Sequence, residues 1–422
     1  MPDSNKPNKP NKPNKSNKPG ESNSPSDPNQ AGAAADDAQA PTGHSSVIAG
    51  LLKLVGQWNK ATSSVEGAFF EQQLKTKIDS YIAGKTDTTL LKLLDALWDA
   101  DPRCYERCAD LIEDRIQSRT PQGAPTQLFI AVPMMAWSRN QLPLGKTEPQ
   151  VLAELKKALM STCLAPNVQL QLGHTLYGPD SLPQGFAATH RLASKYFDAA
   201  TQSIDMPFSR VGMTHVDPFY LADTRFWLGT LQAPAGSPLF KWQLQDELTE
   251  ADFVAWNEAA MTVLGGMFMG CGTVMLPPAD YFTAFRRAEA DIRPFSLQSA
   301  ALMVMSSLEL EPDDLRVVIG ACYERGFEEY RVSVMTRQSD VVLQGVSWPL
   351  LEHEEDETVL LQDIQSLLTA MGILRIKVLD DRLPMDYCDD CDAPLFPDMH
   401  ADLVHTGPPD DEQHDHRKLI VH

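Results

Sequence analysis

The sequence predicts an α+β fold, in which an N-terminal helical region is followed by two units that each combine a sheet with helices. Apolar residues recur three and four positions apart between 46 and 120, as they do on the buried face of a helix. Strand-like apolar runs then interleave with amphipathic helices between 127 and 233. A second set of strand candidates begins near 315.

Residues 1–45 form a tail built on Asn-Lys-Pro repeats. The repeats lack the apolar residues that would offset the entropy of ordering, so we expect this tail to be disordered. Its period of three aligns lysines along one edge of an extended left-handed helix. The tail is therefore either a solubilising spacer or a basic strip for an anionic partner.

The helical region, placed at 46–120, contains the stretches "VIAGLLKLVGQW", "LLKLLDALW" and "CYERCADLIEDRI". Cys104 and Cys108 lie one turn apart on the last of these. They form either half of a metal or redox site or two small residues facing the core. Because no second pair stands nearby, the core interpretation is favoured.

The first α+β unit is placed at 121–250. "LFIAVPMMAW" is typical of a buried strand, "NVQLQLGHTLYG" of a half-buried strand and "TRFWLGTLQAP" of a third. Between them "EPQVLAELKKALMSTCL" and "ATHRLASKYFDAA" have the pattern of amphipathic helices. Strands that alternate with helices indicate a sheet covered on at least one face.

The second α+β unit is placed at 251–384. A helix over "ADYFTAFRRAEADI" is expected to begin near Pro278 and to end near Pro294. "LRVVIGACY", "EYRVSVMT" and "VVLQGVSW" then predict a meander of strands. The helix "TVLLQDIQSLLTAMG", with Gly372 at its C-terminal end, leads to the strand "ILRIKVL".

Composition limits the classes of function. The 422 residues carry a formal charge of −21 and no window approaches the ~20 apolar residues of a membrane helix. The seven cysteines are scattered, which is typical of reduced thiols. We therefore expect a cytoplasmic protein that binds neither nucleic acid nor membrane, because an acidic field repels phosphate groups.

The common catalytic motifs are incomplete in this sequence. The glycine run "GGMFMGCG" lacks the Gly-Lys-Ser/Thr ending of a phosphate loop. "GVSWP" around Ser347 has proline where a nucleophile elbow needs glycine, and His174, His190 and His215 have no triad spacing. The sequence assigns no catalytic residue, and whether the protein is an enzyme is left open.

Two further sets of residues are candidate binding groups. Arg286 and Arg293 lie in the charged segment "RRAEADIR" and form either a salt-bridged helix face or a pair that binds a small anionic ligand. Phe240 and Trp242 stand in a loop after "QAPAG". Such aromatics either anchor a protein partner or pin the loop to its own core.

The stretch "YCDDCDAPLFPDMHADLVH" carries the strongest candidate for chemistry. Cys388 and Cys391 have the spacing of a zinc knuckle, and His400 and His405 supply a second pair at a spacing of five. The cofactor is therefore zinc or none, because a redox dithiol and an idle acidic loop remain alternatives. The eight residues between Cys391 and His400 are fewer than the usual ~12.

The C-terminal segment 385–422 holds ten acidic residues against Arg417 and Lys418, too charged to fold unaided. If it is ordered, something must tie it down, and a structural zinc contributes folding free energy directly. We therefore expect a small zinc-stabilised flap that closes over the second unit.

Several phrases, among them "FIAVPMMAWSR", "HTLYGPDSLP", "PPADYFTAFRRAEADIRPFSLQSA" and "YCDDCDAPLFP", resemble the signature stretches of an uncharacterised beta-proteobacterial family of domains of unknown function. The resemblance covers roughly residues 60–410 and implies no activity, substrate or catalytic residue. Family members often carry glycine after the second cysteine, where this chain has Asp392. Glycine there would ease the left-handed turn of a zinc knuckle.

The leading hypothesis is a non-enzymatic adaptor or regulatory protein that acts through protein contacts. The alternative is an enzyme that holds a small anionic metabolite in a cleft between the two α+β units, with Arg286 or Arg293 as the binding group. A metabolite screen by thermal shift distinguishes the two.

Overall fold

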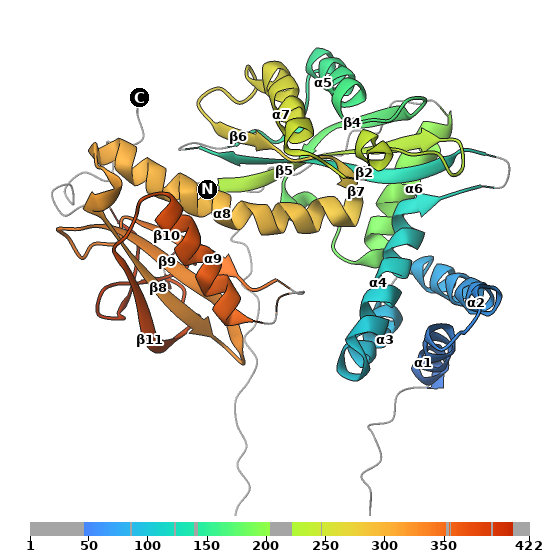
Figure 1. Ribbon diagram of the computed structural model, residues 1–422, viewed down its shortest axis with the longest axis horizontal. Helices are drawn as coiled ribbons and strands as arrows, with labels where there is room; N and C mark the ends of the chain where they lie inside the picture. Colours follow the sequence, from blue (N-terminus) through green and yellow to red (C-terminus); the bar gives the residue numbers. More distant parts are fainter. Residues whose placement is uncertain are drawn as a thin grey trace, which may run out of the picture. The chain divides into compact units, whose positions relative to one another are not determined.

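The structure, a computed structural model, describes residues 46–407, apart from 85–86, 122–123, 139–141, 203–221, 246, 352–353, 355 and 390. The predicted N-terminal tail, His215 and residues 408–422 lie outside this part of the chain. Within it, helices and antiparallel or mixed sheets alternate (Figure 1), which confirms the predicted α+β class.

The N-terminal region is helical, and its helices pack around one apolar core. Asp101 caps the last of them by accepting hydrogen bonds from the backbone N–H groups of Arg103 and Cys104. Cys104 and Cys108 are both buried in this core, and burial raises the pKa of Cys108 to about 12. They are therefore packed as neutral apolar groups. The helices are α1 (Ser46–Asn59), α2 (Ser64–Ile82), α3 (Thr88–Ala100) and α4 (Pro102–Gln117).

The first sheet is antiparallel, in the order β1-β2-β5-β4-β3, with β6 and β7 also paired to β2. The pairing of β6 and β7 places residues 272–280, which the sequence assigned to the second unit, in the first sheet. Periodicity marks a strand without naming its partner, so this pairing was not predicted. The strands are β1 (Ser118–Arg119), β2 (Thr126–Trp137), β3 (Gly145–Lys146), β4 (Gln169–Tyr177), β5 (Ala222–Ala233), β6 (Gly272–Met275) and β7 (Ala279–Asp280).

Helices cover both faces of this sheet, as Figure 1 shows. α5 (Pro149–Thr162) and α7 (Glu250–Leu264) pack on one face, where Trp227 and Trp256 are fully buried. α6 (Phe186–Gln202) and the first half of α8 (Tyr281–Leu308) pack on the other. A sheet covered on both faces explains why β2 is almost continuously apolar in sequence and why β5 is buried along most of its length.

Helix α8 runs through Pro294, where the sequence predicted its end, so that prediction was wrong. Proline removes one helical hydrogen bond, to the carbonyl of Ala290, and ends a helix only when nothing else holds the following turn. Here the turns after Pro294 bury Leu297, Ala301 and Val304 against the second sheet. Tertiary packing outweighs the local cost of the proline, and α8 packs against the first sheet with its first half and against the second sheet with its second half.

The second sheet has the order β10-β9-β8-β11, with β11 parallel to β8 and the other pairs antiparallel. The second half of α8 and α9 (Glu357–Ala370) cover one face. Gly372, just past α9, has a φ of +82°, as expected for a residue that ends a helix. The strands are β8 (Leu315–Tyr323), β9 (Phe327–Thr336), β10 (Gln344–Pro349) and β11 (Ile376–Pro384).

Residues 385–407 lie on the other face of the second sheet. They carry the two-stranded hairpin β12 (Phe396–Pro397) and β13 (Leu403–Val404). Phe396 is 5% exposed and packs with Val318, Met335 and Leu383 of the sheet. The acidic segment is thus folded onto the sheet by an apolar contact as well as by polar ones.

Candidate metal centre

The Cys-x-x-Cys turn is closed by its own backbone. The N–H of Asp392 donates to the carbonyl of Cys388 over 2.9 Å, and the N–H of Cys388 donates to the carbonyl of Ala393 over 2.8 Å. Asp392 has a φ of +57°, the left-handed conformation for which glycine would be easiest. Aspartate is one of the few other residues that adopts it readily, so the knuckle forms without glycine.

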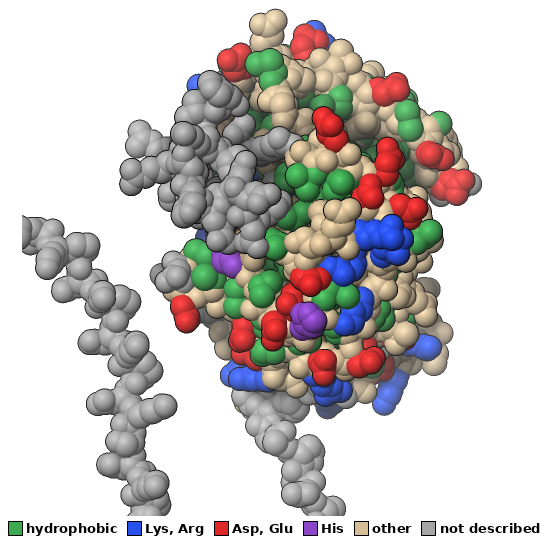
Figure 2. Space-filling model, turned by 90° about the vertical axis from the view of Figure 1, so that its left-hand side faces the viewer, with side chains coloured by type: hydrophobic (Ala, Val, Ile, Leu, Met, Phe, Trp, Pro, Cys, Tyr) green, Lys and Arg blue, Asp and Glu red, His purple; other side chains and the backbone are tan. Residues whose placement is uncertain are grey.

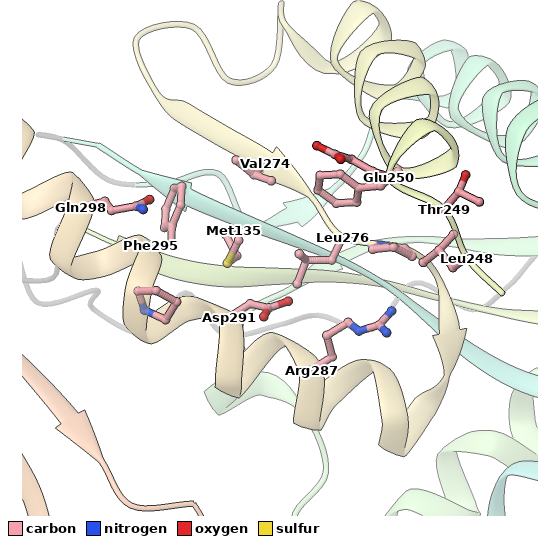
Figure 3. A pocket seen from close by; sticks show the side chains of 13 residues that line it. Met135, Leu248, Thr249, Glu250, Val274, Leu276, Arg287, Asp291, Phe295 and Gln298 are labelled. Atoms are coloured by element: carbon pink, nitrogen blue, oxygen red, sulfur yellow. The ribbon is translucent and has the colours of Figure 1, made fainter. Parts of the chain in front are cut away.

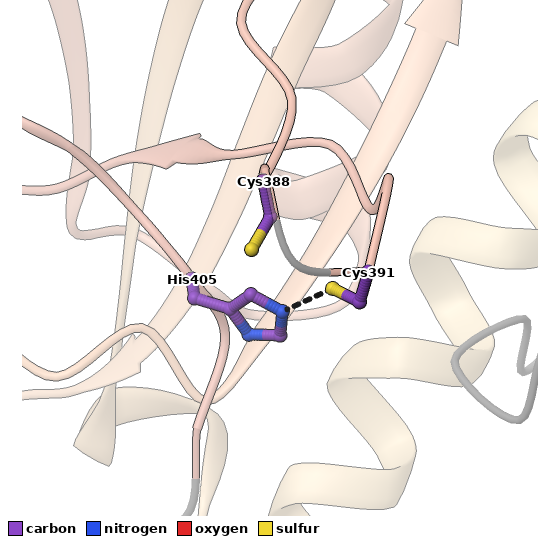
Figure 4. A group of neighbouring side chains, drawn as sticks. All are labelled: Cys388, Cys391 and His405. Carbon is purple, nitrogen blue, oxygen red and sulfur yellow. Dashed lines mark hydrogen bonds between the residues drawn. The ribbon is translucent and has the colours of Figure 1, made fainter.

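Three potential ligands meet at this turn. The ligand atoms of Cys388, Cys391 and His405 all lie within 4.8 Å of one another. The Sγ atom of Cys391 is 3.2 Å from Nε2 of His405 (Figure 4). Ligands on a tetrahedral zinc are about 3.7 Å apart, given Zn–S bonds of about 2.3 Å. Shifts of about 1 Å at most would place the three atoms on one metal ion, with the Cys391–His405 pair moving slightly apart.

The imidazole of His405 is oriented for this role. Its Nδ1 atom is 2.8 Å from the carbonyl oxygen of Thr406. A carbonyl only accepts, so Nδ1 carries the proton and Nε2 presents its lone pair toward the cysteines. A backbone carbonyl on the far nitrogen is the usual orienting contact for a histidine that binds metal.

His400, the fourth predicted ligand, is not part of this group. It stands in the turn of the β12–β13 hairpin, where its backbone N–H donates to Oδ1 of Asp398 over 2.7 Å. The same carboxylate accepts from the N–H of Asp402 over 3.0 Å. Asp398 thus fixes this turn, and the structure brings together three of the four predicted residues.

Arg331, on β9, forms hydrogen bonds to the chain on both sides of the Cys-x-x-Cys turn. Its side chain is fully buried, and its Nε donates to Oε1 of Glu329 over 2.7 Å. Its Nη1 donates to the carbonyls of Asp386 and Leu395 over 2.5 and 2.6 Å, on either side of the Cys-x-x-Cys turn. The guanidinium also lies over the ring of Tyr387, 5.1 Å from its centroid. One buried cation therefore fixes both ends of the candidate metal site.

Other contacts fasten the rest of the segment. The hydroxyl of Ser333 donates to the carbonyl of Pro397 over 2.5 Å, and Nζ of Lys377 donates to the carbonyl of Met399 over 2.6 Å. A Cβ atom on Gly345 would lie 2.3 Å from the ring of Phe396, so only glycine admits this ring. The segment was expected to be too charged to fold unaided, and in its described part these protein contacts supply ties that do not depend on a metal.

Sequence reasoning missed Arg331 and Glu329 as supports of this turn, although their pattern carries a signal. They are two positions apart on a strand and so share a face, together with Ser333. The sequence analysis gave this polar face no role. A glutamate and an arginine on one face of an otherwise apolar strand are also what a covered polar face requires, because each neutralises the other.

Comparison with protein families places almost the whole chain in one group. Residues 38–419 match the family described as protein of unknown function (DUF2863). The chain belongs to this family. Comparison with curated proteins found no match, and comparison with solved structures found none. Membership of DUF2863 brings no activity with it, so any function must be argued from the geometry.

In this DUF2863 chain Arg286 and Arg293 are separately engaged. Arg286 makes a two-pronged pair with Glu113, with Nη2 2.9 Å from Oε2. Arg293 makes another with Glu354, at 2.7 and 2.8 Å, and also donates to the carbonyl of Pro349. The structure does not bring the two guanidinium groups together, and an anion at either one would have to displace a carboxylate.

Phe240 and Trp242 stack on each other with ring centroids 4.7 Å apart. Phe240 is 6% exposed and belongs to the core of the first sheet, and Trp242 is half-buried against the same core. These rings pin their own loop, which was the alternative to a partner-binding role.

None of the helices in the described part of the chain has the length and hydropathy needed to cross a membrane.

Proposed function

We propose that the protein is a cytoplasmic, non-enzymatic adaptor or regulatory protein in which a zinc ion locks the C-terminal segment onto the second sheet. The observation that carries the zinc part is the convergence of Cys388, Cys391 and His405 within 4.8 Å. Bound zinc would keep the C-terminal segment on the face of the second sheet that carries Arg331 and Ser333.

The donor set favours zinc among the common biological metals. Two thiolates and an imidazole are the ligands of structural zinc sites, whereas magnesium and calcium take oxygen ligands. Structural zinc is usually held by four protein ligands, whereas the described residues supply three, so water would fill the fourth position. Cys388 is half-buried while Cys391 and His405 are exposed, so a metal can reach the site without unfolding the segment.

Exposed apolar side chains support a role in protein contacts. Val65 and Phe69 lie one turn apart on α2 and are 80% and 58% exposed. Large apolar groups that stay exposed together are typical of contact surfaces. On the face shown in Figure 2, acidic and basic side chains are interspersed, an arrangement that suits protein contacts better than nucleic-acid binding.

The enzyme hypothesis based on Arg286 or Arg293 has less support, because both guanidinium groups face internal carboxylates. A thermal-shift screen with small anionic metabolites tests it. Strong stabilisation by one anion that is lost in Arg286→Ala or Arg293→Ala would contradict the adaptor proposal.

The zinc proposal is tested by elemental analysis of untagged protein. We expect about one zinc per chain, lost in the Cys388→Ser/Cys391→Ser double variant and reduced in His405→Ala. Cys271→Ser and His400→Ala are matched controls that should keep the metal. Less than about a tenth of an equivalent in the wild type, or equal metal content in the double variant, would reduce the stretch to an acidic loop with two idle thiols.

A further inference from the structure

A partly open pocket lies beside the first sheet, between the start of α7, strand β6 and the middle of α8 (Figure 3). Its volume is about 520 Å³, within the range of roughly 300–1,000 Å³ typical of small-molecule sites. Most of the wall is apolar. Its apolar lining includes Met135, Phe253, Leu276 and Phe295.

Charged groups of both signs project into this apolar space. Arg287 and Asp291 stand one turn apart on α8, and Figure 3 shows both side chains on the side of the helix that faces the strand carrying Leu276. Glu250 belongs to the opposite wall, at the start of α7. The lining therefore presents one cation and two carboxylates.

Arg287 differs from the other two arginines of this helix. Arg286 and Arg293 are each held by a carboxylate, whereas the described residues offer Arg287 no close ion pair. Its charge acts on Asp291, whose pKa is raised by burial and lowered in part by Arg287. Because burial destabilises the charged form of Asp291, a cationic group on a ligand would stabilise this carboxylate more than it would stabilise one in water.

We propose that this pocket binds a small zwitterion with an apolar body, such as an apolar α-amino acid. Arg287 receives the carboxylate of the ligand, Asp291 receives its ammonium group, and the apolar wall takes its side chain. The net charge of the lining, one positive against two negative, disfavours phosphates and other multiply charged anions. The ligand class therefore differs from the small anion that the sequence suggested, and the site needs neither Arg286 nor Arg293.

This site goes beyond the proposed function and does not depend on it. The metal centre lies on the second sheet, whereas the pocket belongs to the first. If the protein is regulatory, a ligand here is the signal to which its contacts respond. Failure of the zinc experiment would leave the pocket untouched, and the reverse also holds.

The experiment uses the purified full-length chain and isothermal titration calorimetry. Leucine, methionine, phenylalanine and tryptophan are titrated first, and we expect at least one to bind with Kd below about 1 mM. The tightest is then compared with two analogues, one lacking the amine and one lacking the carboxylate. For phenylalanine these are 3-phenylpropanoate and phenethylamine. Each is expected to bind at least about tenfold more weakly, because each loses one charge-assisted contact.

Two variants assign the contacts. Arg287→Gln should weaken the amino acid and the amine-free analogue, and leave the carboxylate-free analogue unaffected. Asp291→Asn should give the opposite pattern. The exposed Arg325→Gln and the double variant Cys388→Ser/Cys391→Ser are matched controls that should bind like the wild type. No binding by any of the four amino acids, or equal binding by Arg287→Gln, would overturn the proposal.

Discussion

Replacing Arg331 by methionine should be among the most damaging single changes at the second sheet. Methionine keeps most of the side-chain volume and removes only the guanidinium. The carboxylate of Glu329, whose side chain is 10% exposed, then loses its counter-ion, and the carbonyls of Asp386 and Leu395 lose their donor. Removing one partner of a buried ion pair costs about 3–5 kcal/mol. We expect the free energy of unfolding to fall by that amount.

Urea unfolding measures the loss, and hydrogen exchange over residues 385–407 shows where it falls. Arg316→Met is the matched control on the same sheet, because Asp340, its partner, is 58% exposed and such surface pairs contribute only about 0–1 kcal/mol. The double variant Glu329→Gln/Arg331→Met should recover at least about 1 kcal/mol, since it leaves no unpaired charge. A loss below about 1 kcal/mol in Arg331→Met, or strict additivity in the double variant, would refute this reasoning.

Three further predictions follow from single contacts. Gly345→Ala should displace the Phe396 ring and speed proteolysis within residues 396–404, whereas Gly326→Ala, with open space around it, should not; equal proteolysis rates would contradict this. Burial raises the pKa of Asp291 above its ordinary value of 3.8. Between the ordinary pKa and the raised one the folded chain binds more protons than the unfolded chain, so the stability of the fold falls as pH rises above about 4. Asp291→Asn should therefore gain thermal stability relative to wild type between pH 4 and 7, and a pH-independent difference would count against it. Cys108, whose pKa burial raises to about 12, should resist alkylation at neutral pH in the native protein, and mass spectrometry that found it modified before the exposed Cys391 would show that the helical core opens.

Local sequence pattern predicted the elements of this fold well. The apolar runs of β2 and β5 and the periodic stretches of α5, α6 and α9 each became the expected helix or strand. Such patterns reflect which side chains face a core, and that is a local property. Pairing is not local. The attachment of β6 to β2, and the continuation of α8 past Pro294, depend on surfaces that only the folded chain brings together.

The candidate metal site was likewise predicted in part from the sequence. The two-residue spacing of Cys388 and Cys391 and the later histidines were visible in sequence. The choice of His405 over His400 was not, because it depends on Asp398 holding the hairpin turn and on Thr406 orienting the imidazole. The pocket on α8 was hidden for a related reason. Arg287 and Asp291 have the spacing of an ordinary solvated helix face, and only the packing of α7 beside them turns that face into a wall.

The supports beneath the Cys-x-x-Cys turn determine what zinc would contribute. In classical zinc fingers the ligands converge only when metal binds, so metal binding and folding are one event. Here Arg331 holds the carbonyls on both sides of the turn, and Phe396 is seated over Gly345. Zinc would therefore bind ligands that are already close together, and little of its binding free energy would be spent on ordering the chain. It follows that chelation should loosen the Cys-x-x-Cys turn only in part while both sheets stay folded, and that Arg331→Met should weaken zinc binding although Arg331 touches no ligand atom.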